Sequence, residues 1–353
     1  MMKHVPFKLK AIANYGLHII ASLLLPILLN GCGQPTAQDL WQDYQMRLSN
    51  VFSQDIEAVN LGTLTWPKLP PKRQLQQTLT PPDISLWQLI KLYDCEINTL
   101  VAKRNGPLGK VMPPSQVYIY TRRFIPQAKA CLAQADMDEE TQAALKQAMA
   151  YYQTHEPNYR QNALFHDEWR KSHHALSSWP ITQGFPASGI QTLDYFASLS
   201  NDQSNTDVSK LEEQLKRLAE GRIPGNWLAQ LTLANAWLRN LSDAMNNAKT
   251  LCPAGKSTPK SRIMMNVFRK YFAQQIQPWI SQLKRFGESY QSQLVLVSNN
   301  HPPMTHFYER VFTAKNSPWT EFNYQWQQHV QAWQDHLGQC RAMPKSSQDI
   351  QST

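Results

Sequence analysis

The chain has 353 residues, enough for one large or two modest domains with a sizeable buried core. Its 35 basic and 26 acidic residues give a formal net charge of +9, which fits an anionic neighbour such as phospholipid headgroups and also ordinary solubility. The sequence contains no zinc-finger or RNA-binding signature, so we expect no nucleic-acid partner. Glycine is scarce at 13 residues, whereas Trp, Phe and Tyr are frequent, which favours helices with large apolar faces.

The first 31 residues have the pattern of a secretory signal peptide. A head with three lysines precedes a mostly apolar stretch at residues 11–29, and small residues follow it. The exit reads Leu-Asn-Gly-Cys and ends at Cys32, which resembles the lipobox of bacterial lipoproteins, where this cysteine is lipidated and becomes the new N-terminus. A transmembrane anchor is the alternative, because the apolar run approaches the roughly 20 residues that a span requires. Pro26 and the small residues favour cleavage, so we expect residues 1–31 to be a lipoprotein signal peptide.

The residue after the lipobox cysteine predicts the location. In lipobox proteins an Asp at that place favours retention in the inner membrane, and this chain has Gly33 there. We therefore expect a protein of the outer membrane that is anchored by lipid at Cys32 and faces the periplasm.

Composition along the mature chain predicts several parts and many helices. The parts are a tether at 32–39, an N-terminal helical lobe at 40–176 with a proline-rich linker at 61–82, a C-terminal helical lobe at 190–343 and a loose tail at 344–353. Apolar residues at helical spacing predict helices at 40–59, 83–104, from 115 onward, 136–155, 159–176, 190–199, 208–220, 227–248, 261–297 and 319–337. The expected fold class is all-α, a multi-helix bundle of long amphipathic helices.

Prolines mark the expected interruptions of these helices. Five prolines in the linker at 61–82 argue against a regular element there. Pro126 is expected to kink or divide the helix that begins at residue 115, Pro157 to separate two helices, and Pro278 to kink the longest one.

Four cysteines remain after the lipobox, and their even number suggests two disulfides in an oxidising compartment. Pairing of nearest neighbours, Cys95 with Cys131 and Cys252 with Cys340, is the first expectation among three possible pairings. Free buried thiols are the alternative. Zinc binding is disfavoured, because the sequence has no Cys-x-x-Cys or Cys-x-x-His pair.

The apolar pattern around Cys95 supports a bridge at this cysteine. It predicts that Cys95 points to the polar face of its helix, opposite a stripe formed by Leu86, Ile90, Tyr93, Ile97 and Leu100. A cysteine on the polar side of a helix is better explained by a disulfide than by packing.

Motifs for catalysis are weak in this sequence. Ser257-x-x-Lys260 and Ser281-x-x-Lys284 match the Ser-x-x-Lys of penicillin-recognising enzymes, but the companion Ser-Asp-Asn and Lys-Thr-Gly motifs are absent. We therefore favour a non-catalytic interaction or scaffold module. The alternative is a ligand-binding protein or a hydrolase whose site is assembled from residues scattered in sequence.

The densest group of metal-type side chains is His166-Asp167-Glu168 with His173-His174. On one helix His166 and His173 lie two turns apart, roughly 10 Å along the axis, which is too far to share one ion directly. We interpret the group as a solvated helix face, and we expect neither a metal nor a cofactor.

Basic residues gather where acids are missing. The stretches 97–135 and 244–287 contain no acid and hold 14 basic residues between them. Separate solvated charges are the favoured interpretation of these stretches. The alternative is a basic surface that faces lipid headgroups, an anionic envelope polymer or an envelope protein.

The connection between residues 104 and 115 is the expected interaction surface. It is longer than most helix–helix connections, and its prolines stiffen the backbone. Arg104 and Lys110 would donate to phosphate or carboxylate groups. The alternative is that the loop plugs the bundle. The candidate residues are Arg104, Asn105, Lys110 and Met112.

The same region carries a family resemblance. Asp94-Cys95, the run from Arg104 to Met112, Ser115-Gln116 and Tyr120 resemble an uncharacterised family of proteobacterial lipoproteins, catalogued as domain of unknown function 3080. The resemblance implies a lipidated envelope protein with a helix-loop-helix as its hallmark. It brings no known activity and no catalytic residues. Gly106 stands where the family has a small polar residue, which loosens the loop slightly.

Overall fold

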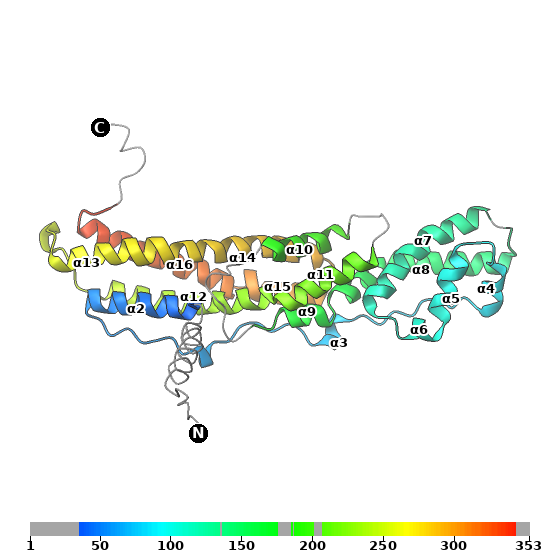
Figure 1. Ribbon diagram of the computed structural model, residues 1–353, viewed down its shortest axis with the longest axis horizontal. Coiled ribbons are helices and arrows are strands. Elements are labelled where there is room, and N and C mark those ends of the chain that lie inside the picture. The colour runs from blue at the N-terminus through cyan, green and yellow to red at the C-terminus, as the bar shows by residue number, and fades with distance from the viewer. Residues whose placement is uncertain (1–34, 135, 176–184, 186, 201–206, 344–353) are drawn as a thin grey trace, which may run out of the picture.

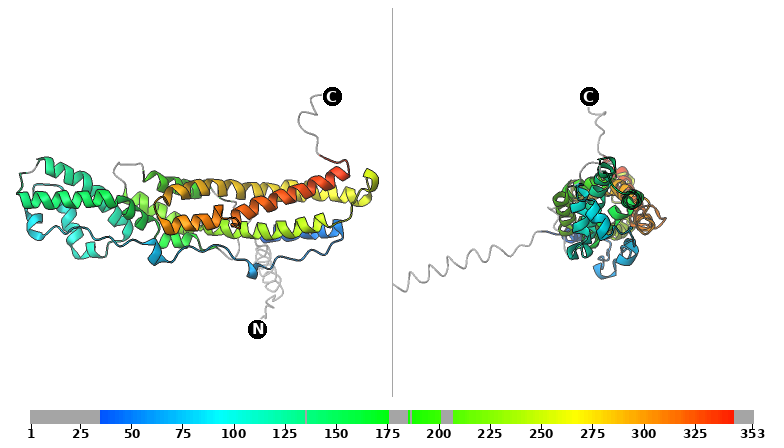
Figure 2. Two further views of the ribbon diagram at one scale, coloured as in Figure 1. Left: turned by 180° about the vertical axis from the view of Figure 1, so that it is seen from behind. Right: turned by 90° about the vertical axis from the view of Figure 1, so that its right-hand side faces the viewer.

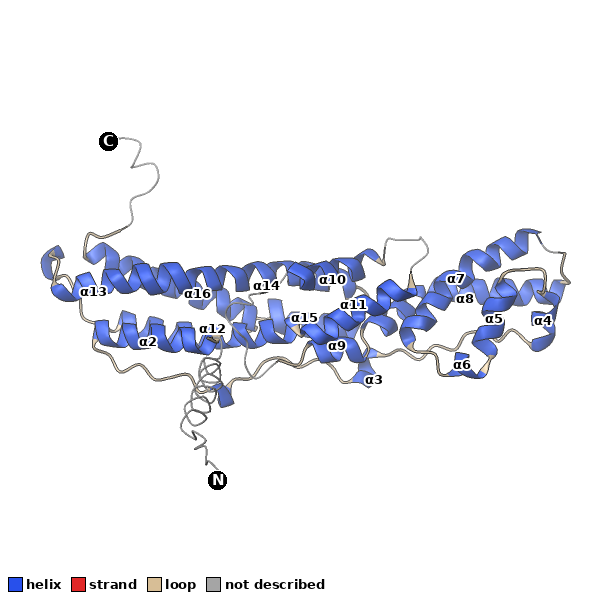
Figure 3. Cartoon of the chain, viewed as in Figure 1, coloured by secondary structure: helices blue, strands red, loops and turns tan. Residues whose placement is uncertain are grey.

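The computed structural model describes residues 35–134, 136–175, 185, 187–200 and 207–343. Within these ranges the chain forms helices, turns and loops and no strand, which confirms the predicted all-α class (Figure 3). The predicted signal peptide at 1–31, Cys32 and the tail at 344–353 lie outside the described residues, as does most of the predicted loop at 177–189. No described helix is both long and apolar enough to cross a membrane.

The helices differ widely in length. They are α2 (Ala37–Phe52), α3 (Lys72–Leu75), α4 (Leu86–Lys91), α5 (Ile97–Asn105), α6 (Pro107–Lys110), α7 (Pro114–Gln134), α8 (Glu139–Leu164), α9 (Asp167–Ser172), α10 (Ala187–Ser198), α11 (Val208–Gly221), α12 (Ile223–Asn246), α13 (Pro259–Val267), α14 (Gln277–Val297), α15 (Pro302–Tyr308) and α16 (Pro318–Gln339). Two 3₁₀ turns, η1 (Leu61–Thr63) and η3 (Pro253–Gly255), lie in connections, and two π-helical segments continue α13 and α15, namely η4 (Phe268–Ile276) and η5 (Glu309–Thr313).

The molecule is elongated, with a long helical bundle at one end and a narrower helical region at the other (Figures 1 and 2). In the bundle α12 packs against α16, α10 against α14, and α2 against α12 and α13. At the narrow end α7 and α8 form a helical hairpin, and α5 packs against α7 with α4 and α6 beside it. We call residues 83–113, which contain α4, α5 and α6, the tip.

The two predicted lobes are linked by packing between distant helices. The helix α2 was assigned to the first lobe, yet it lies among the helices of the second. The helix α9, also from the first lobe, packs against α11. These contacts do not test the predicted division at residues 177–189, which stays a prediction.

Prolines interrupt the helices less than the sequence predicts. Both α7 and α8 run through their prolines, Pro126 and Pro157, so the predicted separation of two helices at Pro157 is wrong. Tyr152 and Tyr159 flank Pro157, are both buried, and have ring centroids 5.7 Å apart. Burial of both rings against the hairpin partner offsets the hydrogen bond that proline removes.

The longest helix bypasses its proline with a different hydrogen-bond pattern. Residues 259–297 form one uninterrupted helix, in which the π-helical η4 ends just before Pro278. In a π-helical segment each backbone N–H bonds to the carbonyl oxygen five residues earlier instead of four. The backbone hydrogen bonds therefore change their partners just before Pro278, which has no N–H to donate.

The predicted helix at 83–104 is wrong in its middle, because a turn at residues 92–96 divides it into α4 and α5. The turn changes the helical phase, so the predicted stripe does not form. Leu86, Ile90 and Tyr93 are exposed, whereas Leu89 and Leu92 are buried. Cys95 lies in this turn rather than on a helix face.

The proline-rich linker is more ordered than the sequence predicts. It contains the short helices η1 and α3, and Leu75 at the end of α3 is fully buried. The Leu75 carbonyl oxygen accepts a hydrogen bond from His301 Nε2 at 3.1 Å, and Asn162 bonds to both backbone groups of Gln77. The linker therefore ties α8 and the start of α15 together.

Two disulfides hold the two ends of the molecule, as the nearest-neighbour pairing predicts. Cys95–Cys131 joins the α4–α5 turn to α7, with a Cα–Cα distance of 5.5 Å. Cys252–Cys340 joins the turn after α12 to the end of α16, with a Cα–Cα distance of 5.1 Å. The first bridge fastens the tip to the α7–α8 hairpin, and the second closes the far end of the bundle.

Candidate ligand-binding site

A pocket of about 210 Å³ opens at the tip, where α5 and α6 meet the α7–α8 hairpin and the end of the linker. Its walls combine charged, amide, phenol and apolar groups. It is lined by Pro81, Pro82, Asp83, Ile84, Val101, Arg104, Asn105, Lys110, Tyr120 and Tyr152. We call it the Arg104 pocket.

Two buried tyrosines contribute hydroxyl groups to this pocket. Tyr120 comes from α7 and Tyr152 from α8, and their rings meet edge to face with centroids 5.7 Å apart. Burial raises the pKa of Tyr120 to about 12, and burial also raises the pKa of Tyr152 above its ordinary value. Both hydroxyls are therefore protonated at neutral pH. A hydrogen bond between them raises the pKa of Tyr152 and lowers that of Tyr120, so Tyr152 donates to Tyr120 and the Tyr120 O–H is the donor that the pair can offer a ligand.

Arg104 lies in the last turn of α5 and is half-buried. Its Nη1 donates to the Gly109 carbonyl oxygen on α6, which holds the guanidinium in place. A side chain at position 109 would overlap the Arg104 backbone, so glycine allows α6 to approach α5 closely. The positive charge of Arg104 opposes the rise in the pKa of both pocket tyrosines, and all three side chains line the same pocket.

Asn105 and Lys110 complete the polar rim together with one carboxylate. Asn105 Nδ2 donates to the Ile84 carbonyl oxygen at 3.1 Å, which ties the segment before α4 to the end of α5. Lys110 and Asp83 are both exposed lining residues. The lining thus carries two positive charges and one negative charge.

Three of the four residues that the sequence proposed as an interaction loop meet in this pocket, namely Arg104, Asn105 and Lys110. Met112 does not line it and packs partly buried against the core. The predicted long loop is wrong in detail, because Pro107–Lys110 forms the helix α6. Sequence reasoning named Tyr120 only within the family resemblance and missed Tyr152 and Asp83, since no local pattern brings residues so far apart in sequence together.

A second, open groove of about 530 Å³ lies between α9 and α11. Its walls alternate in charge, and Lys216 pairs with Glu220 at 3.8 Å. It is lined by Glu168, Lys171, Glu212, Leu215, Lys216, Ala219, Glu220 and Arg222. These charges balance one another, so the groove favours no sign of ligand.

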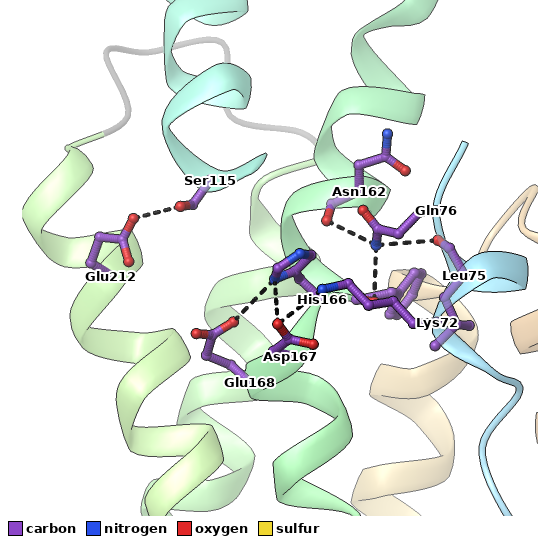
Figure 4. Close-up of polar contacts among 10 residues, drawn as sticks. Lys72, Leu75, Gln76, Ser115, Asn162, His166, Asp167, Glu168 and Glu212 are labelled. Carbon is purple, nitrogen blue, oxygen red and sulfur yellow. Dashed lines mark hydrogen bonds and ion pairs between the residues drawn. The ribbon is translucent and has the colours of Figure 1, made fainter. Parts of the chain in front are cut away.

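Polar contacts around α9 join the hairpin to the bundle (Figure 4). Ser115 at the start of α7 donates to Glu212 at 2.5 Å, and Lys72 of the linker pairs with Asp167 at 2.9 Å. The hydrogen bond from Lys72 lowers the pKa of Asp167. His166 Nδ1 lies 3.6 Å from Asp167 and 3.9 Å from a Glu168 oxygen. This cluster uses its charges to hold helices together.

The histidines of the predicted solvated face separate in the structure. His166 precedes α9 and His173 follows it. His173 is held inside the bundle, where Nδ1 donates to the Trp169 carbonyl oxygen at 2.9 Å and Nε2 accepts from the Tyr290 hydroxyl at 2.7 Å. Burial lowers the pKa of His173 to about 4, so it is neutral at physiological pH. Among the described residues no group of three or more metal-type side chains converges.

The Ser-x-x-Lys pairs do not form catalytic pairs either. Ser257 bonds to Ser261, while Lys260 donates to Ser53 at 2.5 Å. Ser281 donates to the Gln277 carbonyl oxygen of its own helix, and Lys284 lies near Glu288. Each serine and lysine therefore has a separate partner.

These features define an elongated all-α protein with two disulfides and one basic, tyrosine-lined pocket at its narrow end. A family model with the description "Protein of unknown function (DUF3080)" matches residues 41–344. The match covers most of the chain, and the protein belongs to this family, as the resemblance of its 94–120 region predicts. Comparison with curated proteins and with solved structures finds no match.

Proposed function

We propose that this protein is a lipid-anchored, non-catalytic interaction module of the cell envelope whose tip contacts an anionic lipid surface. The observation that carries the proposal is a concentration of exposed apolar side chains on and directly after the short helices α4 and α6 of the tip.

The tip exposes far more apolar surface than its share of the chain. Twelve large apolar side chains are exposed among the described residues, and six of them lie within residues 86–111. Trp87 is 75 % exposed, Leu108 81 % and Val111 75 %. Exposed apolar groups gathered in one place mark an interaction surface, whereas single ones need no explanation. The six are Leu86, Trp87, Ile90, Tyr93, Leu108 and Val111.

The chemistry of the tip fits a membrane surface better than a protein groove. Trp and Tyr prefer the interface between headgroups and acyl chains, and Leu and Val insert below it. On the α6 side the apolar Leu108 and Val111 flank Lys110, and Lys103 is exposed on α5. Lysines near a membrane each gain attraction from anionic lipids.

Carboxylates limit this attraction to one side of the tip. Asp94 and Glu96 are exposed in the turn between α4 and α5, and Lys91 is already paired with Asp138 at 3.0 Å. The α6 side is therefore the more basic of the two, and we assign it to the headgroups. The α4 side then contributes mainly apolar contact.

The anchor rests on the sequence. The basic head, apolar stretch and lipobox at residues 1–32 support lipidation of Cys32, and Gly33 supports the outer membrane with the protein on the periplasmic side. Two disulfides are in keeping with an oxidising compartment such as the periplasm.

A direct test of the anchor is the mass of the N-terminal peptide from cells. We expect a lipid-modified Cys32 at the N-terminus and sedimentation with the outer membrane in a density gradient. An unmodified Cys32, or an uncleaved first segment, would contradict the anchor and leave the tip proposal to its own test.

The tip is tested with vesicles and a secreted, unlipidated Cys32→Ala protein, so that the anchor does not mask binding. We expect flotation with vesicles containing phosphatidylglycerol, and loss of most flotation in Trp87→Ser combined with Leu108→Ser. The matched control combines Ile263→Ser with Leu296→Ser, which removes exposed apolar groups of 54 % and 55 % exposure from the bundle. Equal flotation of the two double variants would refute a tip contact.

A further inference from the structure

We propose that the Arg104 pocket binds a phosphodiester that carries a polyol, such as the glycerol head group of an anionic phospholipid. The inference deepens the proposed lipid contact and rests on it for the lipid as the source of the head group. The ligand chemistry itself stands on the lining of the pocket alone.

The charge of the lining selects a monoanion. Arg104 and Lys110 supply two positive charges and Asp83 supplies one negative charge, so a single negative charge balances the pocket. A phosphodiester carries one negative charge, whereas a phosphomonoester approaches two. The guanidinium fork of Arg104 also matches the geometry of phosphate oxygens.

The neutral groups of the lining point to hydroxyls beside the phosphate. Tyr120 offers an O–H donor from a buried wall of the pocket, and Tyr152 donates its own proton to the Tyr120 oxygen. Asn105 uses its amide N–H toward Ile84, which leaves its amide oxygen as an acceptor, and Asp83 accepts through its carboxylate. A polyol arm supplies the donors that these acceptors need, and a bare phosphate does not.

The size and position of the pocket agree with a lipid head group. About seven waters would fill 210 Å³, which is room for a phosphate with a short polar arm and too small for a whole amphiphile. Lys110 belongs both to the pocket and to α6, where Leu108 and Val111 are exposed beside it. A head group in the pocket therefore leaves its acyl chains next to apolar surface.

The test measures calorimetric binding of two soluble probes to the Cys32→Ala protein, glycerophosphoglycerol and dihexanoyl-phosphatidylglycerol. Dihexanoyl-phosphatidylcholine is the zwitterionic comparison. We expect Lys110→Gln to weaken binding about tenfold or more, because it removes a charge-assisted hydrogen bond. The matched control is Lys103→Gln, which removes an exposed lysine that does not line the pocket, and we expect less than a twofold change.

Two further variants test the buried tyrosine hydroxyl of the pocket and the polyol arm of the ligand. Tyr120→Phe removes one hydroxyl without changing the ring and should weaken both probes. Asp83→Asn should weaken glycerophosphoglycerol relative to dimethyl phosphate, which has no polyol. If Lys110→Gln and Lys103→Gln have equal effects, or if neither anionic probe binds, the pocket proposal is wrong.

The outcomes separate this inference from the proposed function. Suppose that flotation is lost in the double variant Trp87→Ser with Leu108→Ser but is unchanged in Lys110→Gln. This result would support the contact between the tip and the membrane and would contradict lipid binding in the Arg104 pocket. Binding of both probes with equal affinity supports the pocket with a soluble ligand as source. Tighter binding of the dihexanoyl probe, lost on Leu108→Ser, supports the lipid as source.

Discussion

The hydroxyl of Tyr44 on α2 lies 2.8 Å from Nε2 of His329 on α16, and both side chains are buried in the bundle. Trp333 Nε1 donates to the Tyr44 oxygen at 2.7 Å, and Ser242 Oγ lies 3.1 Å from His329 Nδ1. Ser242 in turn donates to the Leu238 carbonyl oxygen at 2.6 Å. Only one direction satisfies every group: Tyr44 donates to Nε2, and a neutral His329 donates from Nδ1 to Ser242.

This network predicts the cost of removing one hydroxyl. Tyr44→Phe leaves His329 Nε2 and Trp333 Nε1 without a partner in a dry interior, so we expect a loss of about 1–3 kcal/mol in the free energy of unfolding. Denaturant titration measures the change. The control is Tyr324→Phe on the same α16 helix, where the side chain is exposed and the effect should stay within about 0.5 kcal/mol. Equal effects in the two variants would show that the network does not stabilise the bundle.

Two histidines inside the bundle, the buried His329 and the partly buried His173, predict that acid destabilises the protein well above the pH range in which carboxylates titrate. Burial lowers the pKa of His329 to about 3 and that of His173 to about 4, from an ordinary value of 6.5. Between pH 6.5 and 4 the unfolded chain therefore binds more protons than the folded chain. Stability is complete above pH 6.5 and falls as the pH drops toward 4, by about 2 kcal/mol per histidine at pH 5.

The measurement is the free energy of unfolding between pH 8 and pH 4.5. His329→Gln removes one titrating group, and its curve should fall less steeply than that of the wild type even if the variant is less stable throughout. A wild-type stability that stays constant down to pH 5 would contradict the neutral, buried state of both imidazoles.

Close packing of aromatic rings around α14 predicts that one glycine cannot be replaced. A Cβ at Gly287 would overlap the Trp319 ring and lie 2.8 Å from the Trp227 ring, and both rings are buried. Gly287→Ala should therefore destabilise the protein by about 1–3 kcal/mol through overpacking. Gly338→Ala on α16 is the matched control, because nothing lies within 4 Å of its Cβ, and it should stabilise by about 0.5–1 kcal/mol. The midpoint of thermal unfolding of the two variants measures the difference. A lower midpoint for Gly338→Ala with an unchanged midpoint for Gly287→Ala would contradict the prediction.

The two disulfides predict different responses to removal. Cys252–Cys340 spans 88 residues and Cys95–Cys131 spans 36, which correspond to about 4.5 and about 4 kcal/mol in the chain-entropy model. Replacing both Cys252 and Cys340 by Ser should lower the midpoint of thermal unfolding of the bundle. Replacing both Cys95 and Cys131 by Ser should mainly loosen the tip, because that bridge fastens the α4–α5 turn to α7.

Limited proteolysis distinguishes the two bridge variants. We expect faster cleavage within residues 83–113 in the variant that lacks Cys95–Cys131, and no change at these sites in the variant that lacks Cys252–Cys340. The same cleavage pattern in both variants would show that the tip depends on the bundle rather than on its own bridge.

Several helices could be predicted well because one face of each is buried along its whole length. The structure places α11 at Val208–Gly221 and α16 at Pro318–Gln339, within two residues of the predicted ranges at 208–220 and 319–337. The predicted helix at 83–104 is wrong because no single buried face runs along its whole length. A turn at Cys95 resets the helical phase, so an unbroken count of apolar residues selected Leu86, Ile90 and Tyr93 as core although they are exposed.

The sequence by itself determined the helical class, the lipobox pattern at Cys32, the even number of cysteines after it and the positively charged Arg104 region, whereas the choice among three cysteine pairings needed the structure. These depend on local spacing, on composition or on the order of residues along the chain. Only the tertiary structure decided that α8 continues through Pro157, and that Tyr120, Tyr152 and Arg104 meet in one pocket. The physical reason is that burial against a neighbouring helix outweighs local propensity, and that contacts between residues far apart in sequence leave no periodic signal in it.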